Sequence, residues 1–184
     1  MVPEVVRRVI TGQKPDGESS FTHVEEIEPL RRVDGTPQWW GVWGFDELPT
    51  LPFFDDRPYQ ASSLFPSPGG LRVQMANIPP GAVTEIASPS AEWLRLRDAS
   101  QVGYDRDNQT GMHTTDTIDV GIVVSGEAWI IQGNGDRVRL RHGDVYVQNG
   151  AEHAWHNDTD EPFLIVFVFL GVPRDADTTK RVTS

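Results

Sequence analysis

Short stretches in which apolar and polar residues alternate recur along the chain, and turn-forming residues bound each of them. A period of two is typical of a β-strand that buries one face. In the first half the pattern predicts strands at residues 5–10, 19–24, 38–45 and 71–78. In the second half it predicts strands at residues 119–125, 127–132, 137–141, 144–148 and 152–157. One short helix is expected at residues 91–97, after the helix-starting pair Ser88-Pro89.

Two further features set how these strands are connected and covered. Asn134-Gly135 lies between two predicted strands and predicts a hairpin closed by a type I′ turn. Residues 163–170 are apolar at both odd and even positions, which is typical of a strand covered on both faces. We expect the barrel interior to cover one face, and the N-terminal arm or a second subunit to cover the other.

Many short strands without an internal repeat indicate an all-β sandwich or barrel. We expect a single domain over residues 1–184, with an N-terminal arm and strands at 1–70, a barrel at 71–172 and a loose tail at 173–184. Residues 84–110 form either a lid or a solvated insertion. Residues 38–45 hold three tryptophans and a phenylalanine, which favours a core plug or an oligomer interface over the wall of an apolar pocket.

Composition excludes several classes of function. The formal net charge of -11, with no local cluster of basic residues, disfavours nucleic acid as a partner. The chain has no cysteine, so thiolate catalysis and cysteine-based metal sites are excluded. The N-terminus lacks the apolar core of a signal peptide, and the longest apolar run, residues 163–172, is far short of a membrane helix. We therefore expect a cytoplasmic protein that does not bind a membrane.

Residue parity brings candidate site residues together. Side chains an even number apart share a face of a strand, so His113, Asp119 and His153 converge if both odd-numbered sets face inward. Two imidazoles and a carboxylate are a known metal-ligand set that leaves positions open for substrate. His156 has the opposite parity and is expected at the surface. Asp116 is a second candidate carboxylate, but it lies off the shared face.

Other residues could complete the site. Thr115 shares the parity of His113 and Asp119, and Gln148 is either a donor in the pocket or a polar group at a strand end. Together with Asp119 they are the candidate catalytic side chains. Trp155, Val123 and Tyr146 are the candidate walls of a substrate pocket.

The stretch from 111 to 157 resembles the paired motifs of the cupin superfamily. His113, Thr115, Asp119 and Gly126 stand at the spacing of the first motif, although the family has histidine and glutamate where this chain has Thr115 and Asp119. The second motif is matched by four features that follow: Gly143, the turn at Asn149-Gly150, His153 and Asn157. Its turn is one residue shorter than in the family and lacks proline. The resemblance covers roughly residues 111–171.

The resemblance implies a double-stranded β-helix, or jelly-roll barrel, that is often a homodimer. It also implies a divalent metal (Fe, Zn, Mn or Ni), which His113, Asp119 and His153 would hold. We expect a small-molecule enzyme in which the metal acts as a Lewis acid on a carbonyl, enol or carboxylate, as in an isomerase, cyclase or dehydratase. Three alternatives remain open: an Fe(II)-dependent dioxygenase with the same ligands, a metal-free binding module for an apolar metabolite, and a structural homo-oligomer with a vestigial pocket.

Overall fold

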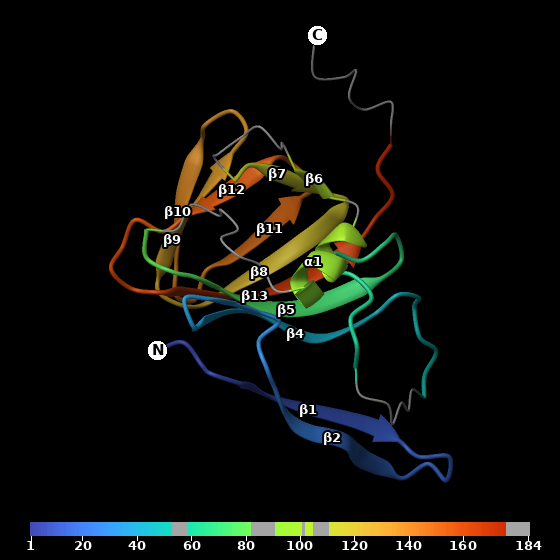
Figure 1. The fold of residues 1–184 in the computed structure, drawn as a ribbon. Coiled ribbons are helices and arrows are strands. Elements are labelled where there is room, and N and C mark those ends of the chain that lie inside the picture. The colour runs from blue at the N-terminus through green and yellow to red at the C-terminus, as the bar shows by residue number, and fades with distance from the viewer. Residues whose placement is uncertain (53–58, 82–90, 101, 105–110, 176–184) are drawn as a thin grey trace.

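The predicted strands are present and close into a barrel (Figure 1). The computed structural model describes residues 1–52, 59–81, 91–100, 102–104 and 111–175. The elements are β1 Val6–Gln13, β2 Ser19–Ile27, β3 Arg31–Val33, β4 Thr36–Phe45, β5 Leu71–Ile78, α1 Ala91–Asp98, β6 Val102–Tyr104, β7 His113–Thr115, β8 Thr117–Ser125, β9 Glu127–Gln132, β10 Arg137–Arg141, β11 Val145–Asn149, β12 His153–His156 and β13 Phe163–Gly171. The prediction of an all-β barrel is confirmed.

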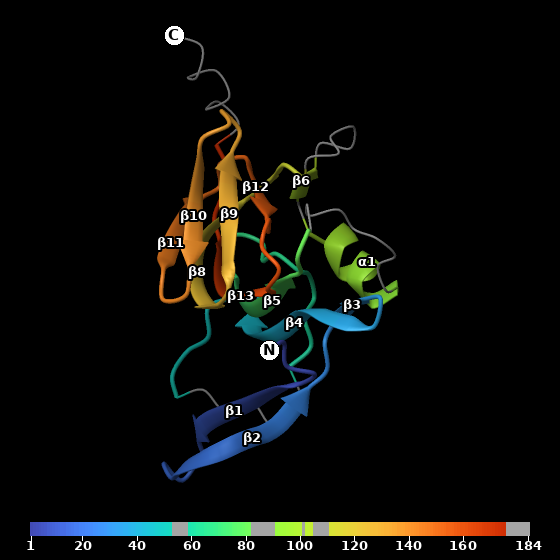
Figure 2. The same cartoon turned by 90° about the vertical axis from the view of Figure 1, so that its left-hand side faces the viewer.

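Two sheets form the barrel, and a third sheet stands apart from it (Figures 1 and 2). The strand order is β11-β8-β13-β5-β4-β3 in the six-stranded sheet and β10-β9-β12-β7-β6 in the five-stranded sheet. The β1–β2 hairpin is the third sheet, and its two antiparallel strands lie where the sequence predicts strands. Strands β3 and β4, which come before residue 71, join β5 in the six-stranded sheet.

The hairpin between β9 and β10 differs from the predicted turn. Its loop has three residues, Gly133 to Gly135, because the Gln132 amide donates to the Asp136 carbonyl at 2.8 Å. Gly135 has φ of 87°, whereas Asn134 does not have a positive φ. A type I′ turn requires positive φ at both central residues, so that prediction was wrong. The glycine supplies the single left-handed position that a three-residue loop needs.

Strand β13 is covered on both faces, as its sequence predicts. Phe163, Ile165, Phe167 and Phe169 belong to the barrel core. On the other face, Leu164 packs with Trp40 and Met75 in a second cluster, which Val2, Val6 and Ile27 of the N-terminal arm partly cover. The arm therefore covers one end of this face.

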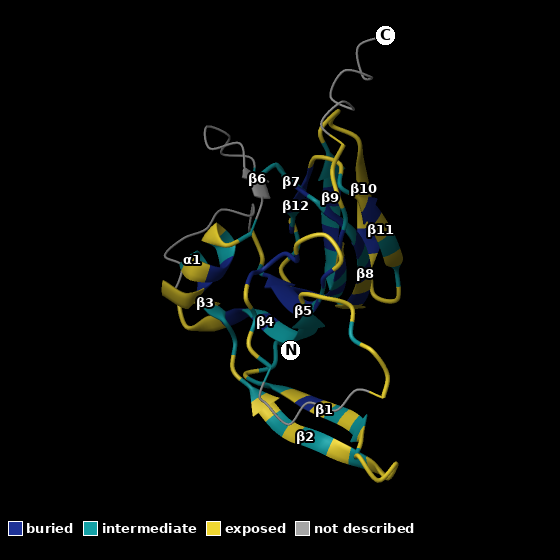
Figure 3. Ribbon diagram, turned by 90° about the vertical axis from the view of Figure 1, so that its right-hand side faces the viewer, coloured by how far each residue is buried: buried dark blue, intermediate teal, exposed yellow. Residues whose placement is uncertain are grey.

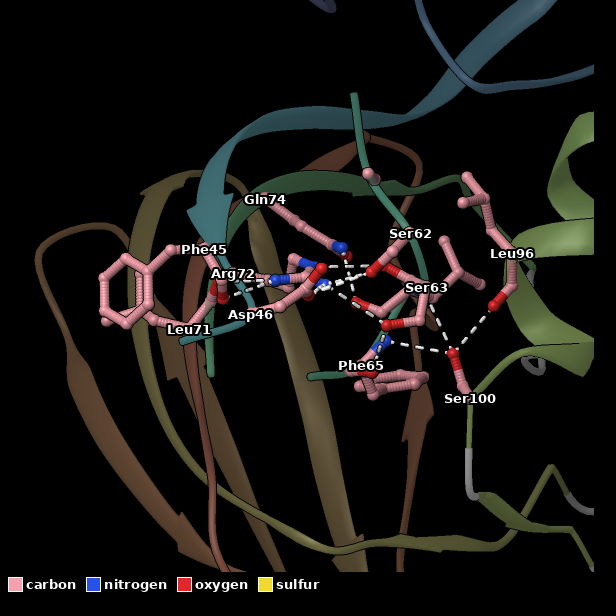
Figure 4. Close-up of polar contacts among 12 residues, drawn as sticks. Phe45, Asp46, Ser62, Ser63, Phe65, Leu71, Arg72, Gln74, Leu96 and Ser100 are labelled. Carbon is pink, nitrogen blue, oxygen red and sulfur yellow. Dashed lines mark hydrogen bonds and ion pairs between the residues drawn. The ribbon is translucent and has the colours of Figure 1, made fainter. Parts of the chain in front are cut away.

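Strand β5 carries polar side chains into the interior. Arg72 is 1% exposed and donates to the carbonyls of Phe45 and Leu71 at 2.7 and 2.9 Å. It also donates to the Ser63 carbonyl at 3.2 Å and pairs with Asp46 (Figure 4). A buried guanidinium with this many acceptors is fully compensated. Arg72 thus anchors the segment before β5 against the barrel.

A second set of hydrogen bonds links that segment to helix α1 (Figure 4). The Ser100 hydroxyl accepts from the amides of Leu64 and Phe65 at 3.0 and 3.1 Å, and it donates to the Leu96 carbonyl at 2.8 Å. The helix was predicted correctly, whereas its proposed N-cap, Ser88-Pro89, lies outside the described residues. Among the described residues, no helix is long and apolar enough to cross a membrane.

Candidate functional site

Two histidines from different strands lie side by side inside the barrel. Strands β7 and β12 are paired at a single position, where His113 faces His153. The centroids of the two imidazole rings are 4.4 Å apart, and the rings are tilted by 49°. The parity argument therefore placed both histidines correctly on the inner face.

Backbone carbonyls hold the Nδ1 atom of each ring. His113 Nδ1 lies 3.0 Å from the Gly111 carbonyl, and His153 Nδ1 lies 2.9 Å from the Ala151 carbonyl. A neutral ring that donates from Nδ1 carries its lone pair on Nε2, the form that binds a metal or accepts a proton. The Gln148 amide lies behind His153: its Nε2 is 3.0 Å from the ring Nδ1 and donates to the Ala151 carbonyl at 2.7 Å.

Burial keeps both rings neutral near neutral pH. It lowers the pKa of His113, although the hydrogen bond with the Gly111 carbonyl opposes the shift. Burial also lowers the pKa of His153 to about 4, and the neighbouring His113 lowers it further in the same direction. Neutral imidazoles are the form that a metal requires.

A carboxyl and a phenol from neighbouring strands complete the polar part of the interior. Asp119 on β8 is 2% exposed, and burial raises its pKa to about 6. Burial also raises the pKa of the Tyr146 phenol well above its ordinary value. Among the described residues, Asp119 Oδ1 and the Tyr146 hydroxyl have no hydrogen-bond partner. Buried polar atoms of this kind are uncommon in folded proteins and are available to a ligand.

These groups line one cavity of about 320 Å³. Its lining is mostly apolar, with the polar groups gathered in a few places, as is typical of sites for small organic molecules. The lining comprises Arg31, Val33, Gln38, Trp39, Phe65, Ala76, Asn77, Ile78, Pro79, Pro80, Gly81, Trp93, Gly111, His113, Asp119, Tyr146, His153, Trp155, Phe167 and Phe169.

Part of the cavity wall comes from the N-terminal half of the chain. Trp39 on β4 and Trp93 on α1 meet edge to face with ring centroids 5.2 Å apart. The Trp39 indole donates to Gln74 at 2.6 Å, and Gln74 donates in turn to the Leu64 carbonyl at 2.6 Å. Sequence analysis ranked a pocket wall second for residues 38–45. In the structure Trp39 lines the cavity, while its neighbour Trp40 is buried on the opposite face of the sheet.

Several predicted site residues do not reach the cavity. The Thr115 hydroxyl accepts a 2.8 Å hydrogen bond from Thr117 and lies in the barrel wall. Val123 is core, and Gln148 contacts the back of His153 and not the cavity. Thr115 and Gln148 are thus not placed to touch a ligand there, and Val123 is not a wall. Shared parity predicted the face of the strand on which each side chain lies, but it could not predict whether the side chain reaches the cavity.

The other predictions have mixed outcomes. Tyr146 and Trp155 line the cavity as predicted, with ring centroids 5.3 Å apart. Asp116, the alternative carboxylate, pairs with Arg174 and does not line the cavity. His142 is exposed. The possible lid at 84–110 lies largely outside the described residues. Sequence analysis missed Arg31, Gln38 and Trp93, which no local motif marks as site residues.

The donor set is chemically suited to a divalent metal. It offers two neutral imidazoles and, in the same cavity, a carboxylate oxygen without a hydrogen-bond partner among the described residues. As the described side chains stand, however, no three His, Asp or Glu residues form a group close enough to share an ion. The structure therefore brings the two histidines together, and Asp119 as a third ligand stays a prediction.

Comparison with known proteins agrees with this barrel. Residues 104–169 match the family model of the cupin domain. Phomopsin biosynthesis cluster proteins C′ and D of Diaporthe leptostromiformis are each 37% identical over 93 residues, which is 50% of this chain and 44% of each relative. The cupin-domain-containing oxidoreductase virC of Hypocrea virens is 44% identical over 48 residues, which is 26% of this chain and 25% of virC. The chain thus spans less than half the length of these relatives.

Solved structures with a similar fold include two bacterial proteins. A conserved protein with a double-stranded β-helix domain from Klebsiella pneumoniae is 24% identical, with 54% of this chain and 66% of that chain covered and a TM-score of 0.38. A Cupin 2 conserved barrel domain protein from Salinispora arenicola is 20% identical, with 60% and 68% covered and a TM-score of 0.36. The match of residues 104–169 to the cupin family model covers the part of the barrel that holds the histidine pair, and it supports the resemblance of this part of the chain to the cupin superfamily.

Proposed function

We propose that the chain is a small-molecule enzyme of the cupin type. Its substrate is a small, largely apolar organic molecule that carries a carbonyl, enol or carboxylate oxygen. The observation that carries the proposal is the pair of neutral imidazoles, 4.4 Å apart, in the wall of a mostly apolar cavity. An apolar cavity that gathers its titratable groups in one region is the usual form of an active site.

The walls account for binding of the apolar part of the substrate. Trp39, Trp93 and Trp155 present large aromatic surfaces, and Phe167 packs against both Trp39 and Trp155. Each Å² of apolar surface removed from water contributes about 25 cal/mol. These rings therefore select for a flat or cyclic apolar body and exclude water from the polar end of the cavity.

His113 and His153, with Asp119 as the third donor, would hold a divalent metal. The metal, when bound, supplies a Lewis acid for the substrate oxygen. The carbonyls of Gly111 and Ala151 orient the two imidazoles. The Tyr146 hydroxyl is protonated at neutral pH and faces the same cavity, so it can donate a hydrogen bond to a substrate oxygen. Isomerisation, cyclisation or dehydration needs such a proton donor.

A second candidate is oxidative chemistry with iron in the same place. Its support is that the relatives virC of Hypocrea virens and srdB of Neurospora crassa are named cupin-domain-containing oxidoreductases. Two other relatives carry the name of the phomopsin biosynthesis cluster, which favours a biosynthetic substrate for this chain in either case. The two candidates share their ligands and differ in the metal.

Elemental analysis of protein purified without added metal tests the proposal. We expect about one metal ion per chain, lost in His113→Ala and in His153→Ala. His142→Ala is the matched control, because His142 is exposed and outside the cavity, and it should keep the metal. Zinc or another redox-silent metal supports the first candidate, and iron supports the second. A wild-type protein that takes up no metal overturns both and leaves the binding module.

A further inference from the structure

One fixed positive charge lies in the wall of the cavity. Arg31 on β3 lines the cavity, and it is the only lysine or arginine among the described residues that do so. An arginine guanidinium stays charged at any physiological pH and offers five N–H donors but no acceptor. A fixed positive charge in the wall of a mostly apolar cavity raises the affinity of that cavity for anions.

The strand register places Arg31 on the inner face of the six-stranded sheet. Arg31 pairs with Trp39, and Trp39 pairs with Ala76. Ala76 pairs in turn with Ile165, which belongs to the barrel core. Residues that pair directly across a sheet share a face, so these four side chains all face the interior. The next residue, Arg32, is exposed and does not line the cavity.

An aromatic wall begins at the Arg31 guanidinium. Strand β3 runs beside helix α1 (Figure 3), and the guanidinium lies over the ring of Trp93 on that helix, 5.4 Å from the ring centroid. The rings of Trp93 and Trp39 meet with their centroids 5.2 Å apart. Trp39 is stacked in turn with Phe167 on β13, with centroids 6.2 Å apart. Apolar surface therefore leads from Arg31 toward the middle of the cavity.

The same wall ends beside the histidines. The centroids of the Phe167 and Trp155 rings are 5.9 Å apart, and Trp155 lies two residues after His153 on β12, so both face the cavity. Along the six-stranded sheet, strands β13, β5 and β4 separate Asp119 on β8 from Arg31 on β3. The cavity therefore has two polar ends, a guanidinium and a group of imidazoles, with aromatic surface between them.

The two ends differ in the groups that they favour. At the histidine end both imidazoles are neutral, and the ionised form of Asp119 repels an anion. At the other end, the planar fork of Arg31 matches the two oxygens of a carboxylate and can donate to both. In the protein itself, a free carboxylate is therefore favoured at Arg31, and a neutral carbonyl or enol oxygen is favoured at the histidines.

We propose that Arg31 forms a carboxylate-binding subsite and that the substrate is therefore a flat, apolar carboxylic acid. The carboxylate binds at Arg31, the apolar body packs against Trp39 and Phe167, and the reacting oxygen lies at the histidine end. The carboxylate and the reacting oxygen are thus different groups at opposite ends of the molecule. The subsite rests on the proposed function, because that function makes the cavity a substrate site.

Calorimetric titration of the full chain, with a chelator present to keep it metal-free, tests the subsite. The probes are 2-naphthoate and 2-naphthamide, which have nearly the same shape and differ in charge. The wild type should bind 2-naphthoate at least ~10-fold more tightly than 2-naphthamide. Arg31→Gln should lose this preference and still bind 2-naphthamide. Arg31→Lys should keep part of it, because lysine keeps the charge but not the fork. Arg32→Gln is the matched control and should behave as the wild type, because Arg32 is exposed and outside the cavity.

A second variant shows at which end the carboxylate binds. His113→Ala should keep the preference for 2-naphthoate, because the histidine end does not hold the carboxylate. A preference that is lost in His113→Ala, or kept in Arg31→Gln, overturns the proposal. So does a wild type that binds 2-naphthoate no more tightly than 2-naphthamide. Circular dichroism checks that each variant is folded.

Elemental analysis separates failure of the subsite from failure of the proposed function. Arg31→Gln purified without a chelator should take up as much metal as the wild type, because Arg31 is not among the metal ligands. A wild type that takes up no metal but prefers 2-naphthoate overturns the metalloenzyme and supports the subsite. A wild type that takes up metal without that preference overturns the subsite and supports the metalloenzyme.

Discussion

Asp119 and His153 are buried titratable groups whose burial acts on stability with opposite dependence on pH. Burial raises the pKa of Asp119 from 3.8 to about 6, so the folded state loses stability as the pH rises through that window. Burial lowers the pKa of His153 from 6.5 to about 4, so the folded state loses stability as the pH falls through that window. The two slopes oppose each other between about pH 4 and 6. In the wild type, the pH dependence of stability that comes from one group is therefore masked by that of the other.

Asp119→Asn should uncover the His153 slope in metal-free protein. At about pH 2 the variant and the wild type should have similar free energies of unfolding, because that pH lies well below the ordinary pKa of 3.8 and the carboxyl is largely neutral in both states there. At pH 7 the variant should be more stable by up to about 3 kcal/mol, since a shift of about two pKa units is removed. Denaturant unfolding at several pH values, with a chelator present, measures this difference.

Asp158→Asn provides the contrast. A hydrogen bond from the Trp129 indole lowers the pKa of Asp158, so this substitution should reduce stability at neutral pH, and the loss should shrink as the pH falls. If Asp119→Asn behaved in the same way, Asp119 would have a stabilising partner in the folded protein that burial alone does not provide.

Gly121 is the residue that lets Tyr146 lie across β8. A Cβ at this position would lie 2.0 Å from the Tyr146 ring, so Gly121→Ala must displace that ring. We expect a loss of roughly 1–3 kcal/mol in the free energy of unfolding, as for other overpacked cores. In a Tyr146→Ala background the same substitution should cost much less. Equal losses in the two backgrounds would show that the ring is not what Gly121 accommodates.

The segment around Leu64, which lies outside the strands, helps to set the shape of the cavity. The segment around Leu64 joins β5 to α1 through Gln74 and Ser100, and it holds Trp39 in the wall through the Gln74 side chain. Arg72 anchors the same segment to the barrel. The position of this part of the cavity wall therefore depends on one buried guanidinium.

Arg72→Met should release that segment before the barrel unfolds. Three backbone carbonyls lose a charged donor, which should lower the free energy of unfolding by at least about 3 kcal/mol. Limited proteolysis should then cut between residues 46 and 65 under conditions in which the wild type is intact. Arg32→Met, which removes the salt bridges of Arg32 with Glu4 and Glu28 at the surface, should change the free energy of unfolding far less, because exposed ion pairs contribute little. Similar losses in the two variants would contradict the anchoring role.

At the scale of the whole molecule, the chain carries a formal net charge of -11, so copies of it repel one another. Dissolved salt ions screen the repulsion between charged groups, so like-charged copies repel most strongly at low ionic strength. Burial of apolar surface between two copies would favour association without any ion pairs between them. Charge and burial thus act in opposite directions on self-association.

Added salt should therefore strengthen any self-association of the chain. We expect its dissociation constant to fall as sodium chloride is raised from low to moderate concentration, because screening reduces the repulsion between two chains of net charge -11. Sedimentation equilibrium over a salt series measures the change. A dissociation constant that rises with salt would indicate that ion pairs hold the copies together, which would contradict the expected repulsion between like-charged chains.

Sequence analysis reached the strands, the family and the inner face of the site, because each depends on local pattern. Strict alternation set which side chains of β7, β8 and β12 face inward, and so His113, Asp119 and His153 were placed on the inside. The turn after β9 was mistaken, since Asn134-Gly135 fits two loop lengths and the strand register selects between them. A local pattern also cannot show whether an inward-facing side chain reaches the cavity, which is why Thr115, Val123 and Gln148 were expected to line it.

By itself, then, the sequence determined an all-β cupin barrel with two histidines on one inner face, because a period of two and the motif spacing are properties of the chain alone. Only the tertiary structure decided that the centroids of the histidine rings lie 4.4 Å apart and that Trp39 and Trp93 help to close the cavity. The physical reason is that distance and closure arise from pairing and packing between segments far apart in the chain, and no local sequence pattern encodes them.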